Sequence, residues 1–125
     1  MKHFVLIAAS DAATRIHLAD GVSHGGYQVE TAHDGVECVR KLRFFRPEVL
    51  ILDLELLWGG YDGVLAFLRE EYVGHDVPTV ILVGRMPEHR VAAMVSPPVV
   101  RYVRKPITCG GLIATIQQCR GAIAV

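Results

Sequence analysis

The sequence lacks the charge excess and the long apolar runs that would tie it to nucleic acid or to a membrane. Of its 125 residues, 13 are basic and 13 acidic, so there is no electrostatic case for either partner. No apolar stretch approaches the length that spans a bilayer. Met1-Lys2-His3 lead at once into a strand-like run, without the cleavage signal of a secretory leader. We therefore expect a cytoplasmic protein that binds neither nucleic acid nor membranes.

Patterns for metals, disulfides and dinucleotides are missing as well. Cys38, Cys109 and Cys119 form no short-spaced pair, which is typical of reduced structural thiols in a cytoplasm. The six histidines lack the spacing of metal ligands. Segment 8–12 has no glycine to cradle a phosphate, and the chain contains no GxGxxG. We expect neither flavin nor nucleotide, so a flavin- or nucleotide-binding enzyme is the least favoured class.

The chain does have the apolar content for one well-packed core, and residues 1–125 are expected to form a single domain. Apolar runs alternate with stretches of helical spacing, which predicts a doubly wound α/β fold with a five-stranded parallel sheet between helices. The expected strands are Phe4–Ala8, Tyr27–Ala32, Val49–Asp53, Thr79–Val83 and Val99–Val103. The expected helices run from about Asp11 to His24, Asp34 to Phe45, Asp62 to Tyr72, Glu88 to Val95 and Thr108 to Arg120. Expected core positions in the first two helices are Ile16, Leu18, Ala19 and Val22, then Val36, Val39, Leu42 and Phe45.

Two charged residues stand where strands end. Asp53 closes the apolar run Val49–Leu52, which is typical of a strand buried on both faces. Lys105 follows a second buried-looking run, Val99–Val103. Because α/β proteins keep their sites at the carboxyl edge of the sheet, an acid and a lysine there can hold and neutralise a phosphoryl group.

In this order and spacing, the segments resemble a response-regulator receiver domain, the flavodoxin-like phosphoacceptor module of two-component signalling. The resemblance covers nearly the whole chain and implies a (βα)5 three-layer sandwich that is a signalling module rather than an enzyme. Its motifs are Asp34-Gly35, Pro47–Asp53, Asp62-Gly63, Val77–Val80 and Tyr102–Pro106. The implied partners are a sensor histidine kinase or phosphotransfer protein and a downstream target. The fourth helix, fifth strand and fifth helix are the implied homodimer or output face, which Arg90, Arg101 and Arg104 make basic here.

By the resemblance, Asp53 matches the phosphoacceptor, whose carboxylate attacks a phosphohistidine or a small acyl phosphate. Lys105 matches the lysine that pairs with this carboxylate and then with the phosphoryl oxygens. The family often has a cis bond after that lysine, so Lys105-Pro106 is a candidate for one. From the residues alone, the alternatives are an aspartate that caps a turn and a surface lysine before a helix.

Ala9 and Ser10 depart from the family, because receivers place two acidic residues there to hold Mg²⁺ with the acceptor carboxylate. The ion neutralises charge as two anionic groups react, and it prefers oxygen ligands with at least one carboxylate. The resemblance therefore implies Mg²⁺, whereas Ala9 and Ser10 argue against its binding. Asp11 and Glu55 are the candidate substitutes. Asp11 either enters the site or, as we favour, caps the first helix, and Glu55 is a ligand, a phosphoryl mimic or solvated.

Two further departures concern the switch and the loop after Asp53. Val83 stands where receivers have a threonine or serine, so the hydroxyl that bonds a phosphoryl oxygen is missing. Tyr102 matches the aromatic residue whose rotation follows that hydroxyl, and we favour a fixed position for it. The loop is longer than usual, with Leu57 in the place of a proline. Leu57, Trp58 and Tyr61 either cover a dry pocket or, as we favour, contact a partner.

Two functions are consistent with these residues. The one we favour is an atypical, degenerate receiver, a pseudo-receiver that acts mainly as a protein-interaction module with phosphorylation of Asp53 weak or absent. The alternative is a competent phosphoacceptor, phosphorylated on Asp53 by a histidine kinase and using a non-standard metal site.

Overall fold

A computed structural model describes residues 4–71 and 77–123, in which strands and helices alternate as predicted. The strands are β1 (Phe4–Ala8), β2 (Gln28–Ala32), β3 (Val49–Asp53), β4 (Thr79–Val83) and β5 (Val99–Arg104). The helices are α1 (Ala12–His24), α2 (Gly35–Phe44), α3 (Gly60–Glu71), α4 (Glu88–Met94) and α5 (Cys109–Ile123). The predicted end of the third helix, Tyr72, lies outside the described residues. Within them, no helix combines the length and the apolar character needed to cross a membrane.

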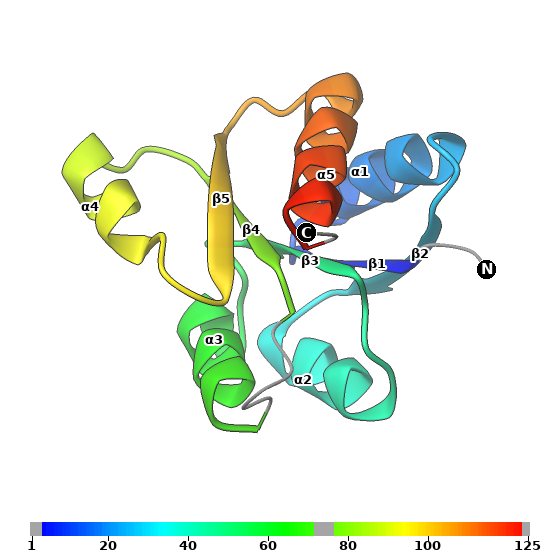
Figure 1. Cartoon of the computed structure of the whole chain (residues 1–125). Coiled ribbons are helices and arrows are strands. Elements are labelled where there is room, and N and C mark those ends of the chain that lie inside the picture. Colours follow the sequence, from blue (N-terminus) through cyan, green and yellow to red (C-terminus); the bar gives the residue numbers. More distant parts are fainter. Residues whose placement is uncertain (1–3, 72–76, 124–125) are drawn as a thin grey trace.

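The five strands form one parallel sheet in the order β2-β1-β3-β4-β5. Helices α1 and α5 pack on one face, and α2, α3 and α4 pack on the other (Figure 1). The predicted flavodoxin-like, doubly wound three-layer fold is therefore confirmed. Because the strand order reverses between β1 and β3, the binding crevice expected of such a sheet lies outside the carboxyl ends of these two strands.

The inner strands explain the apolar runs in the sequence. β3 and β4 are buried along their whole length, because helices cover both of their faces. The expectation of a buried run over Val99–Val103 is wrong, since Val99 alone among the β5 residues is buried. β5 lies at an edge of the sheet, where it pairs only with β4 and its faces are less covered.

Two expected core residues, Ile16 of α1 and Val36 of α2, are each 66% exposed. In α1 the buried residues are Leu18 and Val22, which are four positions apart and therefore share one side of the helix. A residue two positions before such a pair lies on the opposite side, as Ile16 does. α2 repeats the pattern, because Val36 precedes the buried Cys38 by two positions.

Aspartate side chains fix the starts of α1 and α2. Asp11 caps α1 and accepts hydrogen bonds from the Thr14 backbone N–H at 2.9 Å and the Thr14 hydroxyl at 2.6 Å. These hydrogen bonds lower the pKa of the exposed Asp11 carboxyl. Asp34 caps α2 by accepting a hydrogen bond from the Glu37 N–H at 2.8 Å. The cap that we favoured for Asp11 is confirmed.

The three cysteines are free thiols in different surroundings. Cys38 is buried between the sheet and the helices α2 and α3. Cys119 is buried on the opposite face of the sheet, among residues of α1 and α5. Burial raises the pKa of Cys38 to about 12 and also raises the pKa of Cys119. Cys109, at the start of α5, is only partly buried.

These surroundings predict selective thiol chemistry. In the native protein near pH 8, a soluble aromatic disulfide reagent is expected to modify Cys109 well before Cys38 and Cys119, because only exposed thiolate reacts. Absorbance of the released thiolate should show one fast equivalent, which Cys109→Ser removes, and reaction of all three cysteines after unfolding in urea. Rapid reaction of Cys38 in the folded protein would contradict its buried position.

Candidate functional site

Asp53 and Lys105 meet at the carboxyl edge of the sheet. The side chain of Asp53 is only 4% exposed, and the Lys105 ammonium lies 3.0 Å from each of its two carboxylate oxygens. The Glu55 backbone N–H also donates to Asp53 Oδ1, at 2.9 Å. Lys105 is held at the end of β4, because its own backbone N–H donates to the Val83 carbonyl at 2.8 Å. The Lys105-Pro106 bond is cis.

Glu55 places a second carboxylate beside Lys105. Its Oε1 atom lies 3.5 Å from Lys105 Nζ, and its side chain is 73% exposed. The same oxygen would lie 3.0 Å from a Cβ atom added to Gly84, so the carboxylate leans towards the end of β4. The lysine therefore faces two carboxylates, one buried at the end of β3 and one exposed above it.

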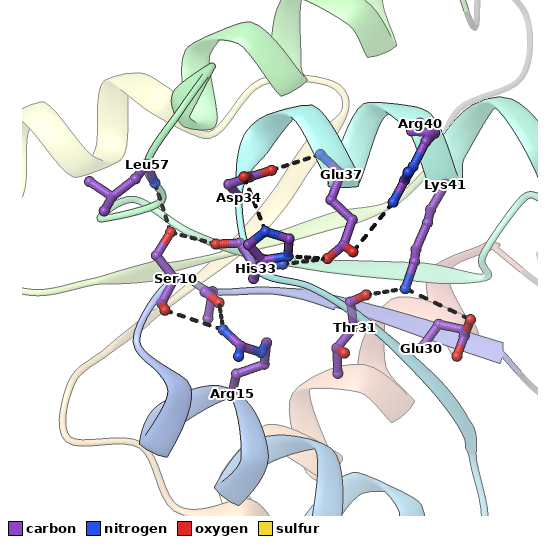
Figure 2. Close-up of polar contacts among 11 residues, drawn as sticks. Ser10, Arg15, Glu30, Thr31, His33, Asp34, Glu37, Arg40, Lys41 and Leu57 are labelled. Atoms are coloured by element: carbon purple, nitrogen blue, oxygen red, sulfur yellow. Dashed lines mark hydrogen bonds and ion pairs between the residues drawn. The ribbon is translucent and has the colours of Figure 1, made fainter.

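Ser10 ties three loops together (Figure 2). Its hydroxyl donates to the His33 carbonyl at 2.8 Å and accepts a hydrogen bond from the Leu57 N–H at 2.9 Å. Ser10 follows β1, His33 follows β2 and Leu57 follows β3, so one side chain joins the carboxyl ends of three strands. Arg15 of α1 donates to the carbonyls of Ala9 and Ser10, at 2.9 and 3.2 Å. The loop after β1 therefore accepts hydrogen bonds from a neutral donor, the Leu57 N–H, and from a cationic one, the Arg15 guanidinium.

The side chains at this edge do not fit Mg²⁺. Ala9 is buried and carries no ligand atom, the Ser10 hydroxyl is already paired on both sides, and the Asp11 carboxylate caps α1. The remaining carboxylates, Asp53 and Glu55, both face the neighbouring ammonium. In the described part of the chain, no three acidic, histidine or cysteine side chains are grouped as a metal site requires.

Val83 and Tyr102, the two residues at the expected switch, do not share a hydrogen bond. Val83 is fully buried at the end of β4 and has no polar side-chain atom. The Tyr102 hydroxyl donates to Glu88 at the start of α4, and Arg104 binds the other Glu88 oxygen at 2.7 Å. The hydrogen bond from Tyr102, with help from that of Arg104, lowers the pKa of Glu88, and the same bond raises the pKa of Tyr102.

The loop after β3 is fastened to the start of α2. The N–H groups of Gly35 and Val36 donate to the carbonyls of Leu57 and Trp58, at 2.9 and 3.1 Å. A Cβ atom on Gly35 would lie 2.7 Å from the Trp58 oxygen, so only glycine permits this approach. Trp58 adopts a left-handed backbone with φ of 48°. Its side chain is 75% exposed and that of Leu57 is 59% exposed, so neither covers a dry pocket, whereas Tyr61 packs against the core.

His33 and Glu37, which sequence reasoning did not single out, complete this junction. Glu37 Oε1 accepts a hydrogen bond from the His33 N–H and lies 2.7 Å from His33 Nδ1 (Figure 2). His33 Nε2 lies 3.3 Å from Asp34. Burial acts to raise the pKa of Glu37, but the hydrogen bonds from His33 and the charge of Lys41 outweigh it, and the pKa falls below its usual value. The sequence did contain one signal for Glu37, because it stands three residues after the aspartate Asp34 that caps α2.

A buried carboxylate paired with a lysine at the carboxyl edge of a flavodoxin-like sheet defines the receiver class of α/β proteins. Residues 5–117 match the family model of the response regulator receiver domain, and the chain belongs to this family. Receiver domains are generally signalling modules rather than enzymes in the usual sense. They typically bind Mg²⁺ at the phosphorylation site, and they interact with histidine kinases or phosphotransfer proteins and with effector domains.

Relatives and solved structures agree with this assignment. The chain is 30% identical over 113 residues to Response regulator MprA of Mycobacterium ulcerans, which covers 90% of this chain and 48% of that relative. The chain thus spans about half the length of the curated relatives it matches. The receiver domain of Francisella response regulator 1452 superposes with a TM-score of 0.88 at 18% identity, covering 98% of this chain and 99% of that one. Chemotaxis response regulator CheY4 of Vibrio cholerae superposes with a TM-score of 0.86 at 21% identity, covering 95% of this chain and 99% of that one. Both solved structures therefore share the fold of this chain.

The buried ion pair predicts an unequal response to single and double substitutions. Lys105→Met should lower the free energy of unfolding by about 3 kcal/mol, because it leaves the Asp53 carboxylate buried without a counter-charge. Lys105→Met combined with Asp53→Asn should be less destabilised than Lys105→Met alone, since the buried charge is gone and the amide still accepts from the Glu55 N–H. Urea unfolding at neutral pH measures both. Equal destabilisation of the single and double variants would contradict the pairing.

Glu37 predicts a contribution to stability that is lost in acid. Because its pKa is lowered in the folded state, the unfolded chain takes up this proton first as the pH falls. The contribution is complete above the ordinary glutamate value of 4.5 and disappears as the pH falls through the folded pKa. Urea unfolding of the wild type and Glu37→Gln, from neutral pH downwards, should show a difference that shrinks in acid. A pH-independent difference would assign the effect to packing instead.

Proposed function

We propose that the chain is an atypical receiver domain that acts mainly as a protein-interaction module, with phosphorylation of Asp53 weak or absent. The observation that carries the proposal is the loop after β1. There the buried Ala9 offers no ligand, and the Ser10 hydroxyl is bound to the loops after β2 and β3. Attack of Asp53 on an anionic phosphoryl donor needs added positive charge, and these residues do not supply a site for the metal ion that provides it.

Glu55 adds a second obstacle. Its carboxylate lies beside Lys105, the one ammonium that contacts Asp53 in the described residues. An incoming phosphoryl group would have to displace or repel this carboxylate before it reached the lysine. Glu55 in this position is better explained as a built-in anion, a partial mimic of the phosphoryl group, than as a metal ligand.

The switch residues support an output that does not follow phosphorylation. Val83 cannot donate to a phosphoryl oxygen, which removes a charge-assisted hydrogen bond worth about 1–3 kcal/mol. That amount equals the coupling free energy on which many switches depend. Tyr102 is already bound by Glu88 in α4, so its position has a cause other than the state of Asp53.

In this proposal the partners are proteins of a cytoplasmic two-component pathway. They are a sensor histidine kinase or phosphotransfer protein and a downstream target. A homodimer through α4, β5 and α5 belongs to the same proposal, because the resemblance to receivers implies these elements as the dimer or output face. The alternative, a competent phosphoacceptor with a non-standard metal site built from Asp11 or Glu55, has one observation in its favour, the intact pair of Asp53 and Lys105.

Incubation with Mg²⁺ and acetyl phosphate, followed by intact-mass measurement, tests the proposal. We expect no phosphoryl mass on the wild type, while a receiver that retains the acidic pair, treated in parallel, becomes modified. Trp58, the sole tryptophan, reports on the same edge of the sheet, and its fluorescence should not change on addition of millimolar Mg²⁺ and then beryllofluoride.

Asp53→Asn and Glu55→Gln are the matched variants. A mass gain on the wild type that Asp53→Asn abolishes would overturn the proposal in favour of the phosphoacceptor. Loss of that gain in Glu55→Gln would then identify Glu55 as a substitute ligand. Under the proposal, Glu55→Gln stays unmodified as well, because the ligands missing after β1 are still missing.

A further inference from the structure

A groove of about 420 Å³ lies between α2 and the start of α3, away from Asp53. Gly35, Gly59 and Gly63 contribute no side chains to its lining, and Val36 and Val39 make it apolar. Val36 is one of the large apolar side chains that the fold leaves exposed. A Cβ atom added to Gly63 would meet no atom within 4 Å, so the space above this residue is open.

The loop that carries Leu57 and Trp58 borders this groove. The carbonyls of both residues accept hydrogen bonds from the first N–H groups of α2, and the Ser10 hydroxyl accepts from the Leu57 N–H. Two bulky apolar side chains are thus exposed on a backbone that is fixed at several points. Binding through them costs little loop ordering, and a large aromatic side chain is a common centre of binding energy.

The two charged residues that line the groove are both basic. Arg40 and Arg43 line it, the first 3.5 Å from Glu37 and the second 5.1 Å above the ring of Phe67. Asp62 is an acidic residue in the first turn of α3, and its carboxylate accepts a hydrogen bond from the Gly63 N–H. The chain as a whole is neutral, which disfavours nucleic acid or anionic lipid as the occupant of the groove.

We propose that α2, the loop after β3 and the start of α3 form a docking surface for an acidic amphipathic helix of another protein. Apolar residues of that helix enter the groove and contact Trp58, and its carboxylates lie against Arg40 and Arg43, as in other helix-in-groove complexes. This docking surface rests on the proposed function as a protein-interaction module. It adds where the partner binds and what chemistry the partner has.

A synthetic helical peptide tests this surface with the intact chain. The probe is a tryptophan-free amphipathic peptide of about 16 residues, with leucines on one face and glutamates beside them. Titration should shift Trp58 emission to shorter wavelength in a saturable way. A peptide with lysines in place of the glutamates should bind at least about tenfold more weakly.

Gly63→Leu and Gly110→Leu are the matched variants. Both glycines are helical, and a Cβ atom added to either meets no atom within 4 Å, so leucine can begin without a clash and raises helix propensity in both. Gly63→Leu fills the groove and should weaken binding of the glutamate peptide at least about tenfold. Gly110→Leu, on α5, should leave it unchanged.

Equal binding of both peptides, or unchanged binding to Gly63→Leu, would overturn the assignment. So would tighter association with phosphatidylglycerol vesicles than with the glutamate peptide, or occupation of the groove by a second copy of the chain. These outcomes are separate from the acetyl phosphate assay. Failure of the peptide would remove this surface and leave the interaction function standing, whereas a phosphoryl mass on Asp53 would overturn that function whatever the peptide does.

Discussion

The site depends on one electrostatic constraint, the need of the buried Asp53 carboxylate for a positive charge. A carboxylate so little exposed is costly unless it is paired and hydrogen-bonded, and Lys105 and the Glu55 N–H meet both needs. Lys105 reaches Asp53 because β4, which neighbours β3, holds the lysine backbone through the Val83 carbonyl. The strand order that buries the core therefore also brings Lys105 to Asp53, where its charge neutralises the carboxylate.

Ser10 supplies a second constraint, which acts on the loops around the site. Here a neutral hydroxyl joins the loops after β1, β2 and β3 through two hydrogen bonds, each worth about 1 kcal/mol. These loops are therefore fixed to one another. The exposed Trp58 is presented from this fixed backbone.

The pattern of apolar residues predicted the strands and helices well, whereas the sequence predicted the contacts between loops poorly. Alternating apolar runs were sufficient for the sheet and for Asp53 at its edge, and the preference of aspartate for helix starts was sufficient for the cap at Asp11, because each depends on residues close in sequence. The exposure of Ile16 and the edge position of β5 depend on which neighbours cover an element, and a single sequence does not state that. The bridge from Ser10 to His33 and Leu57 joins residues far apart in the chain, and hydrogen bonds between loops leave no repeating pattern. Asp34-Gly35 was identified only as a family motif, and the structure shows that the backbone of the loop after β3 approaches this glycine.

The two faces of the domain stand in different relation to Asp53. A change at one site alters another only if the two states of the first make different contacts with the second. On the side of α4 and β5, Val83 offers no donor to a group on Asp53, and Tyr102 is bound by Glu88. On the side of α2, the loop begins with the Glu55 N–H that binds Asp53 itself and continues to Leu57 and the Ser10 hydroxyl. Asp53 therefore reaches the loop around Trp58 through a covalent and hydrogen-bonded route, whereas its route to β5 passes through the Lys105 ammonium and not through Val83 or Tyr102.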